Sequence, residues 1–163
     1  MPGETDLAQS LGQLLKARGL RIATAESCTG GWIAKTLTDV PGSSAWFERG
    51  FVTYSNDAKQ DMLGVQEALI RRFGAVSGEC VAAMAEGALR VGRSDVAVAV
   101  SGIAGPDGGS AAKPVGTVWF GFSGVGGDTV TLHRLLPGDR DAVRRAAVGI
   151  ALQGVIDRLR SGA

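Results

Sequence analysis

Histidine and cysteine are scarce in this sequence of 163 residues, which has one histidine, His133, and two cysteines, Cys28 and Cys80. A mechanism that needs several histidines is therefore excluded, and these residues match no metal-ligand spacing, so we expect no catalytic metal. His133 lies in an alternating segment that predicts a surface strand, which argues against a Ser-His-Asp triad. Two cysteines are too few for a disulfide framework, and we expect both to be reduced.

The sequence also lacks a dominant charge and a long apolar run. Lysine plus arginine number 17 and aspartate plus glutamate 16, a formal net charge of +1 that gives no electrostatic reason to expect a nucleic acid or an anionic membrane as partner. No apolar run approaches the roughly 20 residues that span a bilayer. The start, MPGETDLAQS, lacks the basic and apolar regions of a signal peptide. We therefore expect a soluble, cytoplasmic protein.

Glycine is abundant, with 25 residues placed between periodic apolar segments. The pattern predicts helices over 5–19, 32–40, 56–63, 66–73, 77–92 and 139–159, with N-caps at Thr5, Asn56 and Ser77, and strands over 20–25, 51–55, 96–100, 115–122 and 129–136. Helices interleaved with apolar strands, plus one hairpin, indicate a single α/β domain over residues 1–163. We expect a three-layer α/β/α sandwich with a mixed, mainly parallel sheet.

Glycine-rich or hydroxyl-rich segments follow three of these strands, and in such sheets ligands bind where strands end. The segment 24–31 offers hydroxyls, a thiol and backbone N–H groups at the start of a helix, so Thr29, Gly30 and Gly31 are candidates to hold a phosphate or an oxyanion. An ordinary capped strand-to-helix turn is the alternative interpretation. The segment is neither a Walker loop nor a GxGxxG fingerprint, so nucleotide binding by those routes is disfavoured.

A tyrosine and a lysine flank the next strand end. Tyr54 is the only tyrosine, and Lys59 follows it by five residues across the start of a helix. A lysine shielded from water loses its charge more easily and can act as general base on a serine. The alternative is a solvated lysine beside a packed tyrosine. Ser44 has the same ambiguity, as a turn residue or a reactive hydroxyl.

Two further groups have alternative interpretations. Cys28 is either a thiol nucleophile at a helix start or, as we favour, a small buried residue. Arg140 and Arg144 are spaced i, i+4 on the last helix, where they either clamp a phosphate or carboxylate or form a solvated charged face.

Several motifs occur together and in order along the chain. They are AESCTGG at 25–31, VPGSSAWF at 40–47, GFVTYSNDAK at 50–59, GAVS at 74–77, SGIAGPDGG at 101–109, KPVGTVWFGF at 113–122 and GDRDAVRR at 138–145. Together they resemble the CinA C-terminal domain family in its stand-alone form, over nearly the whole chain. The resemblance implies a three-layer α/β fold and hydrolysis of the carboxamide of nicotinamide mononucleotide to nicotinate mononucleotide and ammonia, in the recycling of pyridine nucleotide toward NAD.

The resemblance implies a Ser/Lys amidohydrolase with Lys59 as the base and no metal or organic cofactor. Ser27 and Ser44 are alternative nucleophiles; we favour Ser27, because a sharp turn presents its hydroxyl beside backbone N–H groups, with Ser44 orienting or relaying a proton. Tyr54 is expected to hydrogen-bond the Ser/Lys pair or the carboxamide. Ser101 stands where the family commonly has threonine, which keeps the hydroxyl.

For the substrate phosphate, the resemblance makes Arg140 and Arg144 candidates, together with the loop from Gly102 through Gly105 to Gly109. Lys113 either assists or anchors its own turn. The implied partners are the small-molecule substrate and a second copy of the chain, with no nucleic acid and no membrane. Functions of the additional domain in longer CinA proteins are not expected here.

Two alternatives from other classes stay open at this point. One is a non-catalytic pyridine-nucleotide sensor or interaction module, since fold-level resemblance does not prove activity. The presence of Ser27, Ser44, Tyr54 and Lys59 argues against it. The other is a Cys28 thiol hydrolase, which alkylating reagents would inactivate.

Overall fold

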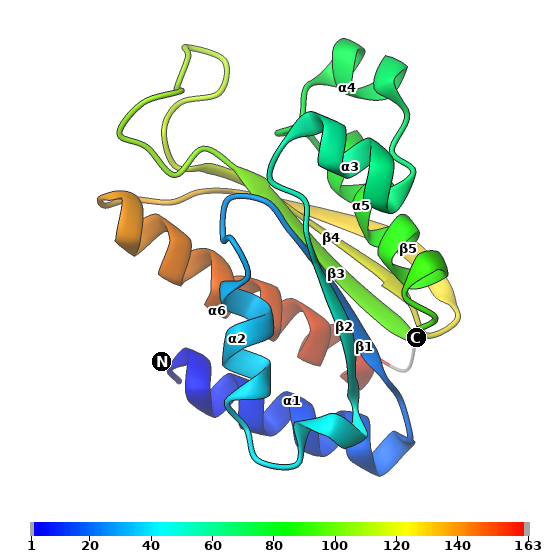
Figure 1. Ribbon diagram of the computed structural model, residues 1–163. Coiled ribbons are helices and arrows are strands. Elements are labelled where there is room, and N and C mark those ends of the chain that lie inside the picture. The colour runs from blue at the N-terminus through cyan, green and yellow to red at the C-terminus, as the bar shows by residue number, and fades with distance from the viewer. Residues whose placement is uncertain (1, 162–163) are drawn as a thin grey trace.

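The computed structural model describes residues 2–161 and contains a five-stranded sheet with helices on both faces (Figure 1). In chain order the elements are α1 (Glu4–Arg18), β1 (Ile22–Glu26), α2 (Trp32–Thr38), the 3-10 turn η1 (Ser43–Ala45), β2 (Phe47–Val52), α3 (Asn56–Leu63), α4 (Glu67–Phe73), α5 (Gly78–Val91), β3 (Val96–Gly102), β4 (Thr117–Gly124), β5 (Gly127–Leu135) and α6 (Arg140–Arg160).

The sheet is mixed, with strand order β2-β1-β3-β4-β5. β1 pairs in parallel with β2 and β3, whereas the β3–β4 and β4–β5 pairs are antiparallel. The expectation of a mixed sheet is confirmed, and its parallel pairings are confined to β2, β1 and β3. The carboxyl ends of these three strands therefore meet at one edge of the sheet, which is where ligands bind in such folds.

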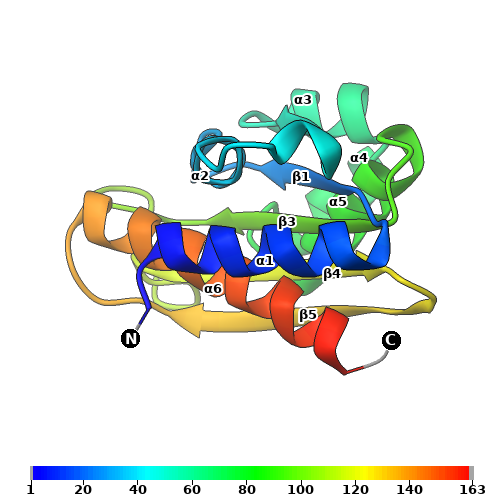
Figure 2. The ribbon, with the colours of Figure 1, turned by 90° about the horizontal axis from the view of Figure 1, so that it is seen from below.

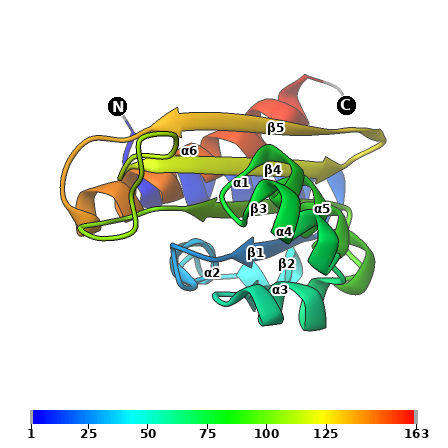
Figure 3. The same cartoon turned by 90° about the horizontal axis from the view of Figure 1, so that it is seen from above.

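Helices α1, α2 and α6 cover one face of the sheet, and α3, α4 and α5 cover the other. Seen from below, α1 and α6 lie in front of the sheet (Figure 2), and seen from above, α5 lies in front of it, with α3 near the β2 edge (Figure 3). The first face packs the larger strand residues, such as Ile22, Val98 and Phe120, against leucines of α1 and α6. The second face carries small residues, including Ala25 and Ala99, under α5. The three-layer architecture is thus confirmed.

The small residues bring the second helical layer close to the sheet. A Cβ atom on Gly121 of β4 would clash with the backbone carbonyl of Val81 in α5, and one on Gly87 of α5 would clash with the carbonyl of Leu63 in α3. Because side chains are missing at these crossings, the helices approach backbone to backbone. The stack of β4, α5 and α3 therefore holds α3 tightly in place.

Helix starts differ in detail from the sequence expectations. Thr5 lies inside α1, whose N-cap is Gly3 with no side-chain hydrogen bond, so the predicted threonine cap is wrong. Ser55 caps α3 by accepting from the Ala58 N–H, one residue before the predicted Asn56. The Ser77 cap of α5 is confirmed, since its hydroxyl accepts from the Cys80 N–H. Over residues 2–161, no helix combines the length and the hydropathy required to cross a membrane.

Candidate active site

The structure brings Ser27 and Lys59 into direct contact at the carboxyl edge of the parallel strands. β1 ends at Glu26, and Ser27 continues the ladder by donating its N–H to the Val100 carbonyl at 3.1 Å. β2 ends at Val52, and three further residues lead into α3, whose first turn carries Lys59. The Lys59 Nζ lies 3.0 Å from the Ser27 Oγ. A predicted base and a predicted nucleophile thus form a hydrogen-bonded pair.

Lys59 is enclosed although it is a lysine, with only 1% of the residue exposed. Its Nζ donates to the backbone carbonyls of Thr53 at 2.8 Å and Tyr54 at 3.1 Å. Burial lowers the pKa of the Lys59 ammonium below 10.5, while the neighbouring Cys80 and Cys28 raise it. No ion pair involves Lys59 within the described part of the chain. The environment therefore favours the neutral amine.

The two carbonyls also determine where the amine points its lone pair. A neutral lysine amine has two N–H donors and one lone pair. In the neutral form, with its N–H bonds directed at Thr53 and Tyr54, the amine has its lone pair left for the Ser27 hydroxyl. That hydroxyl otherwise donates a long hydrogen bond of 3.4 Å to the Tyr54 carbonyl. This arrangement suits removal of the serine proton, the role of a general base.

The turn after Ser27 is held by its own hydrogen bonds. Gly30 and Gly31 have φ of 60° and 104°, a backbone conformation that glycine adopts without strain. The Glu26 carboxylate accepts hydrogen bonds from the Thr29 hydroxyl at 2.6 Å and the Ile33 N–H at 2.8 Å. Among residues 2–161, no acceptor is present for the N–H groups of Cys28 and Thr29. Two backbone donors are therefore free directly after the serine.

Cys28 adjoins Ser27 but is poorly suited to attack a substrate. The residue is buried. The pKa of its thiol is raised to about 11, mainly because of this burial. At neutral pH the thiol is protonated, whereas a nucleophilic cysteine reacts as the thiolate. The Lys59 amine contacts the Ser27 hydroxyl, and no hydrogen bond joins it to the Cys28 thiol among the described residues. The geometry favours the interpretation of Cys28 as a small buried residue.

Tyr54 and Ser101 lie at the same edge but contribute differently. The Tyr54 backbone carbonyl accepts from Lys59, while 62% of the residue is exposed and its hydroxyl has no partner within residues 2–161. The expected hydrogen bond from the Tyr54 hydroxyl to the pair is absent in this structure. Ser101 is buried next to the end of β3, on the strand whose Val100 bonds Ser27. Both residues belong to segments that end at the same edge of the sheet as Ser27.

Ser44 is not brought to this pair. It lies in η1, which precedes β2, and the Trp46 carbonyl just after η1 accepts from the Ile22 N–H at the start of β1. Ser27 lies at the other end of β1, about 16 Å away at roughly 3.3 Å per strand residue. Within one chain, parallel strands place the two serines at opposite edges of the sheet, so this geometry does not support Ser44 as the nucleophile or as a proton relay, and its role stays a prediction.

The arginines of α6 bind backbone around the site. Arg144 donates to the carbonyls of Cys28 at 3.0 Å and Thr29 at 3.3 Å, and Arg140 donates to the Gly105 carbonyl at 2.7 Å. The predicted phosphate ligands thus connect α6 to the 27–31 turn and to the glycine-rich loop. Lys113 donates to the Phe73 carbonyl at 2.8 Å, which supports its anchoring interpretation.

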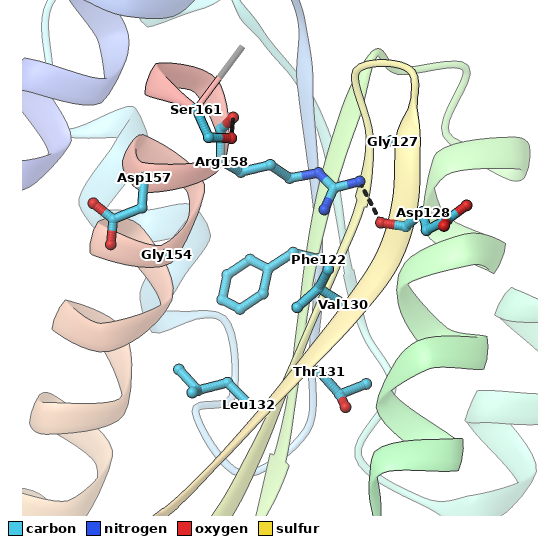
Figure 4. Close-up of a pocket in the computed structure, with 10 residues that line it drawn as sticks. All are labelled: Phe122, Gly127, Asp128, Val130, Thr131, Leu132, Gly154, Asp157, Arg158 and Ser161. Carbon is cyan, nitrogen blue, oxygen red and sulfur yellow. Dashed lines mark hydrogen bonds between the residues drawn. The ribbon is translucent and has the colours of Figure 1, made fainter. Parts of the chain in front are cut away.

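Two cavities differ in their relation to the pair. A polar cavity of about 500 Å³ lies along the 29–31 turn and includes Lys35, Arg144 and Arg145. An apolar cavity of about 460 Å³ lies between α6 and the β4–β5 hairpin, where Arg158 donates to the Asp128 carbonyl (Figure 4). The second cavity includes neither Ser27 nor Lys59. Within the described residues, no cluster of three or more metal-ligating side chains is present.

Comparison with known proteins identifies the family. The model of the CinA C-terminal domain matches residues 4–159. The chain belongs to the CinA C-terminal domain family. It is 60% identical over 147 residues to the nicotinamide-nucleotide amidohydrolase PncC of Escherichia coli strain K12, covering 90% of this chain and 89% of that protein. The protein of the same name from Pseudomonas putida is 55% identical over 152 residues, with 93% and 94% covered.

Membership of the CinA C-terminal domain family is also evident in three dimensions. The crystal structure of the competence/damage inducible protein CihA from Agrobacterium tumefaciens superposes with a TM-score of 0.93 at 47% identity, over 98% of each chain. The resemblance inferred from the motifs and the α/β fold are therefore confirmed. The roles of individual site residues remain predictions.

Sequence reasoning missed two features of the site. The Thr53 carbonyl accepts from Lys59, and every residue type offers a carbonyl, so no sequence signal marks it. Glu26 could have been found, because a carboxylate before a glycine-rich turn can accept N–H groups at the following helix start. Its carboxylate does so with Ile33 and Ala34.

Proposed function

We propose that the protein hydrolyses the carboxamide of nicotinamide mononucleotide, producing nicotinate mononucleotide and ammonia. The observation that carries the proposal is the 3.0 Å contact between the Lys59 amine and the Ser27 hydroxyl in a buried site. The 60% identity to a protein named nicotinamide-nucleotide amidohydrolase supports the choice of substrate. An amide bond is stable, and an activated serine splits its hydrolysis into two easier steps.

In the first step, neutral Lys59 takes the proton of the Ser27 hydroxyl as its oxygen attacks the carboxamide carbon. The N–H groups of Cys28 and Thr29 have no other acceptor in the described structure and are the proposed donors to the developing oxyanion. Lys59 then passes its proton to the leaving nitrogen, and ammonia departs. The product of this step is an ester between Ser27 and the nicotinate nucleotide.

In the second step, water replaces the ammonia and Lys59 acts as base again. The amine takes a proton from the water as its oxygen attacks the ester carbon, and the proton returns to the Ser27 oxygen when the ester breaks. Nicotinate mononucleotide leaves, and the starting state is restored. This cycle uses no metal or organic cofactor. Tyr54, Ser101 and Gly102 are the proposed contacts of the nicotinamide group.

The proposed phosphate site is the polar cavity beside the turn. Gly31, Arg144 and Arg145 line it, and the Gly31 N–H has no acceptor among the described residues. Both guanidinium groups already have partners, Arg144 in the carbonyls of Cys28 and Thr29 and Arg145 in the Glu4 carboxylate, so an anion would bind beside these contacts. Arg140 and the 102–109 loop are the second candidate for the phosphate. If Arg144 binds the phosphate, replacing it with glutamine should raise KM for the nucleotide more than KM for nicotinamide riboside, which has no phosphate. If KM rises equally for both substrates, Arg144 does not bind the phosphate and only stabilises the turn.

The proposed setting is the cytoplasm, where a pyridine nucleotide released from the NAD pool would be recycled. The small substrate is the proposed partner, and the formal net charge of +1 supports the expectation of no nucleic-acid partner. A homodimer is also proposed. Sedimentation of the purified protein across a range of concentrations would test it directly.

The test of the function is product analysis with the purified chain. Nicotinamide mononucleotide is incubated with the wild type and with Ser27→Ala, with chelator present, and both ammonia and nicotinate mononucleotide are quantified. We expect equal amounts of the two products from the wild type only. Binding of the nucleotide without turnover would instead favour a sensor or interaction module.

A further inference from the structure

Glu26 is a buried acid that the proposed reaction does not use. Only 1% of the residue is exposed, and it directly precedes Ser27. Its carboxylate receives three hydrogen bonds, from the Thr29 hydroxyl at 2.6 Å, the Ile33 N–H at 2.8 Å and the Ala34 N–H at 3.0 Å. No lysine or arginine forms an ion pair with it among residues 2–161. A buried carboxylate is costly to keep unless donors satisfy it.

The three donors lie within the turn that carries the serine and in the helix that follows it. Thr29 belongs to the turn itself, while Ile33 and Ala34 belong to the first turn of α2. The backbone of Glu26 is fixed as well, because its carbonyl accepts the Thr53 N–H at 2.8 Å. Thr53 in turn supplies a carbonyl to Lys59. Glu26 therefore connects the nucleophile's turn to the residue that orients the base.

The Glu26 side chain acts on the turn and not on the base. It points to the face covered by α2, whereas Lys59 comes from α3 on the opposite face. No hydrogen bond or ion pair joins the two side chains among residues 2–161, so we expect removal of the carboxylate to leave the hydrogen bonds of the Lys59 amine in place. A change at Glu26 should consequently alter the placement of Ser27 and of the free N–H groups without changing the acidity of the base.

We infer that Glu26 is a positioning residue, which fixes the 27–31 turn so that the Ser27 hydroxyl and the N–H groups of Cys28 and Thr29 face the same reacting carbon. The inference rests on the proposed function. Glutamine in place of Glu26 keeps the size but turns an acceptor into an NH2 donor facing another donor. Misplacement of reacting groups by about 1 Å can lower rates by about a hundredfold.

The experiment measures two reactions of Ser27 in the full chain. One is kcat and KM for nicotinamide mononucleotide, and the other is the rate constant for labelling of Ser27 by a fluorophosphonate, which reports the serine without the substrate. In Glu26→Gln and in Thr29→Val we expect kcat and the labelling rate to fall between about tenfold and a hundredfold, with KM changed less than about threefold. The midpoint of the pH profile should not move.

Matched variants separate positioning from a loss of folding. Thr36→Val removes a similar hydroxyl hydrogen bond within α2, from Thr36 to the Trp32 carbonyl at 2.8 Å, and should retain wild-type rates. Thr29→Ser keeps the hydroxyl and should rescue the loss in Thr29→Val. If a variant is merely unstable, a smaller fraction of its molecules would be labelled, and the rate constant for labelling of the folded molecules would equal that of the wild type.

The outcomes are distinguishable from failure of the proposed function. If the wild type does not hydrolyse the nucleotide but the labelling rates follow the expected order, the substrate is wrong and the positioning role stands. Wild-type labelling rates in Glu26→Gln and Thr29→Val would overturn the positioning role. A wild-type protein that is not labelled at Ser27 would overturn both the nucleophile and the role of Glu26.

Discussion

The molecule has two serine turns that resemble each other locally and differ in their place in the fold. Ser27 precedes a glycine pair and the helix α2, and Ser44 follows a glycine in the 3-10 turn η1. Ser27 follows the carboxyl end of β1, whereas Ser44 precedes the amino end of β2. Because β1 and β2 are parallel, these ends lie at opposite edges of the sheet.

Strand direction and chain order together decide which serine meets the base. Lys59 follows β2, so α3 delivers it to the carboxyl edge, where Ser27 lies and Ser44 does not. Ser44 is exposed, and its hydroxyl has no hydrogen-bond partner among the described residues. The position of a serine relative to the strand ends therefore identifies a reactive hydroxyl better than the local sequence motif around it does.

The largest expected effect is the loss of the pair itself. Ser27→Ala removes the nucleophile and Lys59→Met removes the base, and each should lower kcat by about a thousandfold or more. Because the two groups act as a unit, the double variant should be hardly slower than either single one. Steady-state ammonia release measures this, with exposed Lys16→Met as the control. Additive losses would contradict a shared role.

The pH dependence of the rate should follow the neutral form of Lys59. Burial lowers the pKa of this ammonium below 10.5, so the active amine accumulates as the pH rises through the lowered pKa. Below that pKa, kcat/KM should fall about tenfold per pH unit, and above it the profile should level off. A profile independent of pH, or one that falls as pH rises through this range, would contradict Lys59 as the base.

The same pKa links Lys59 to stability. The folded state binds the lysine proton less tightly than the unfolded state, so between the lowered pKa and 10.5 the unfolded state carries more protons. The free energy of unfolding should therefore rise with pH in that window because of Lys59. Denaturant titrations at several pH values should show that this contribution is absent from Lys59→Met and present in Lys16→Met.

Ser44→Ala sharpens the comparison of the two serine turns. Ser44 is exposed at the distant edge, so kcat should change by about twofold at most, as for other surface substitutions. Ammonia release under saturating nucleotide is the measurement. A loss as large as that of Ser27→Ala would break the comparison, and it would require a second copy of the chain to bring its own Ser44 to the site.

The smallest effect is expected at Cys28, the neighbour of Ser27. Cys28→Ala should retain kcat within about twofold, because a buried thiol with a pKa of about 11 is not a nucleophile at neutral pH. Activity is compared before and after treatment with an alkylating reagent, in the wild type and in the variant. Inactivation of the wild type that the variant escapes, together with a slow variant, would favour a thiol hydrolase.

The sequence predicts those parts of the fold that local patterns determine. The apolar run of β3 and the Ala-rich α5 with its Ser77 cap are of this kind. The pairing of Ser27 with Lys59 was implied by the family resemblance and not by a local pattern. β2 starts at Phe47, earlier than predicted. The prediction missed this start because the first residues of the strand include the polar residues Glu48 and Arg49, which form an ion pair at the sheet edge.

Features set by long-range contacts could not be predicted in this way. Arg144 lies 115 residues from Thr29 in sequence, and only the packing of α6 reveals that its guanidinium binds the turn's carbonyls. The acceptors of Lys59 are backbone atoms, which carry no residue signature. The direction of each parallel strand, which separates Ser44 from the pair, emerges only when the sheet is assembled.

The central claim is that Ser27 forms the covalent intermediate. It is tested most directly by acid quench during turnover of nicotinamide mononucleotide, followed by mass spectrometry of tryptic peptides. Cleavage after Arg21, Lys35 and Arg49 places Ser27 and Ser44 in different peptides, and fragmentation separates Ser27 from Cys28. We predict the nicotinate nucleotide as an ester on Ser27. An adduct on Ser44 or Cys28 instead would contradict the assignment.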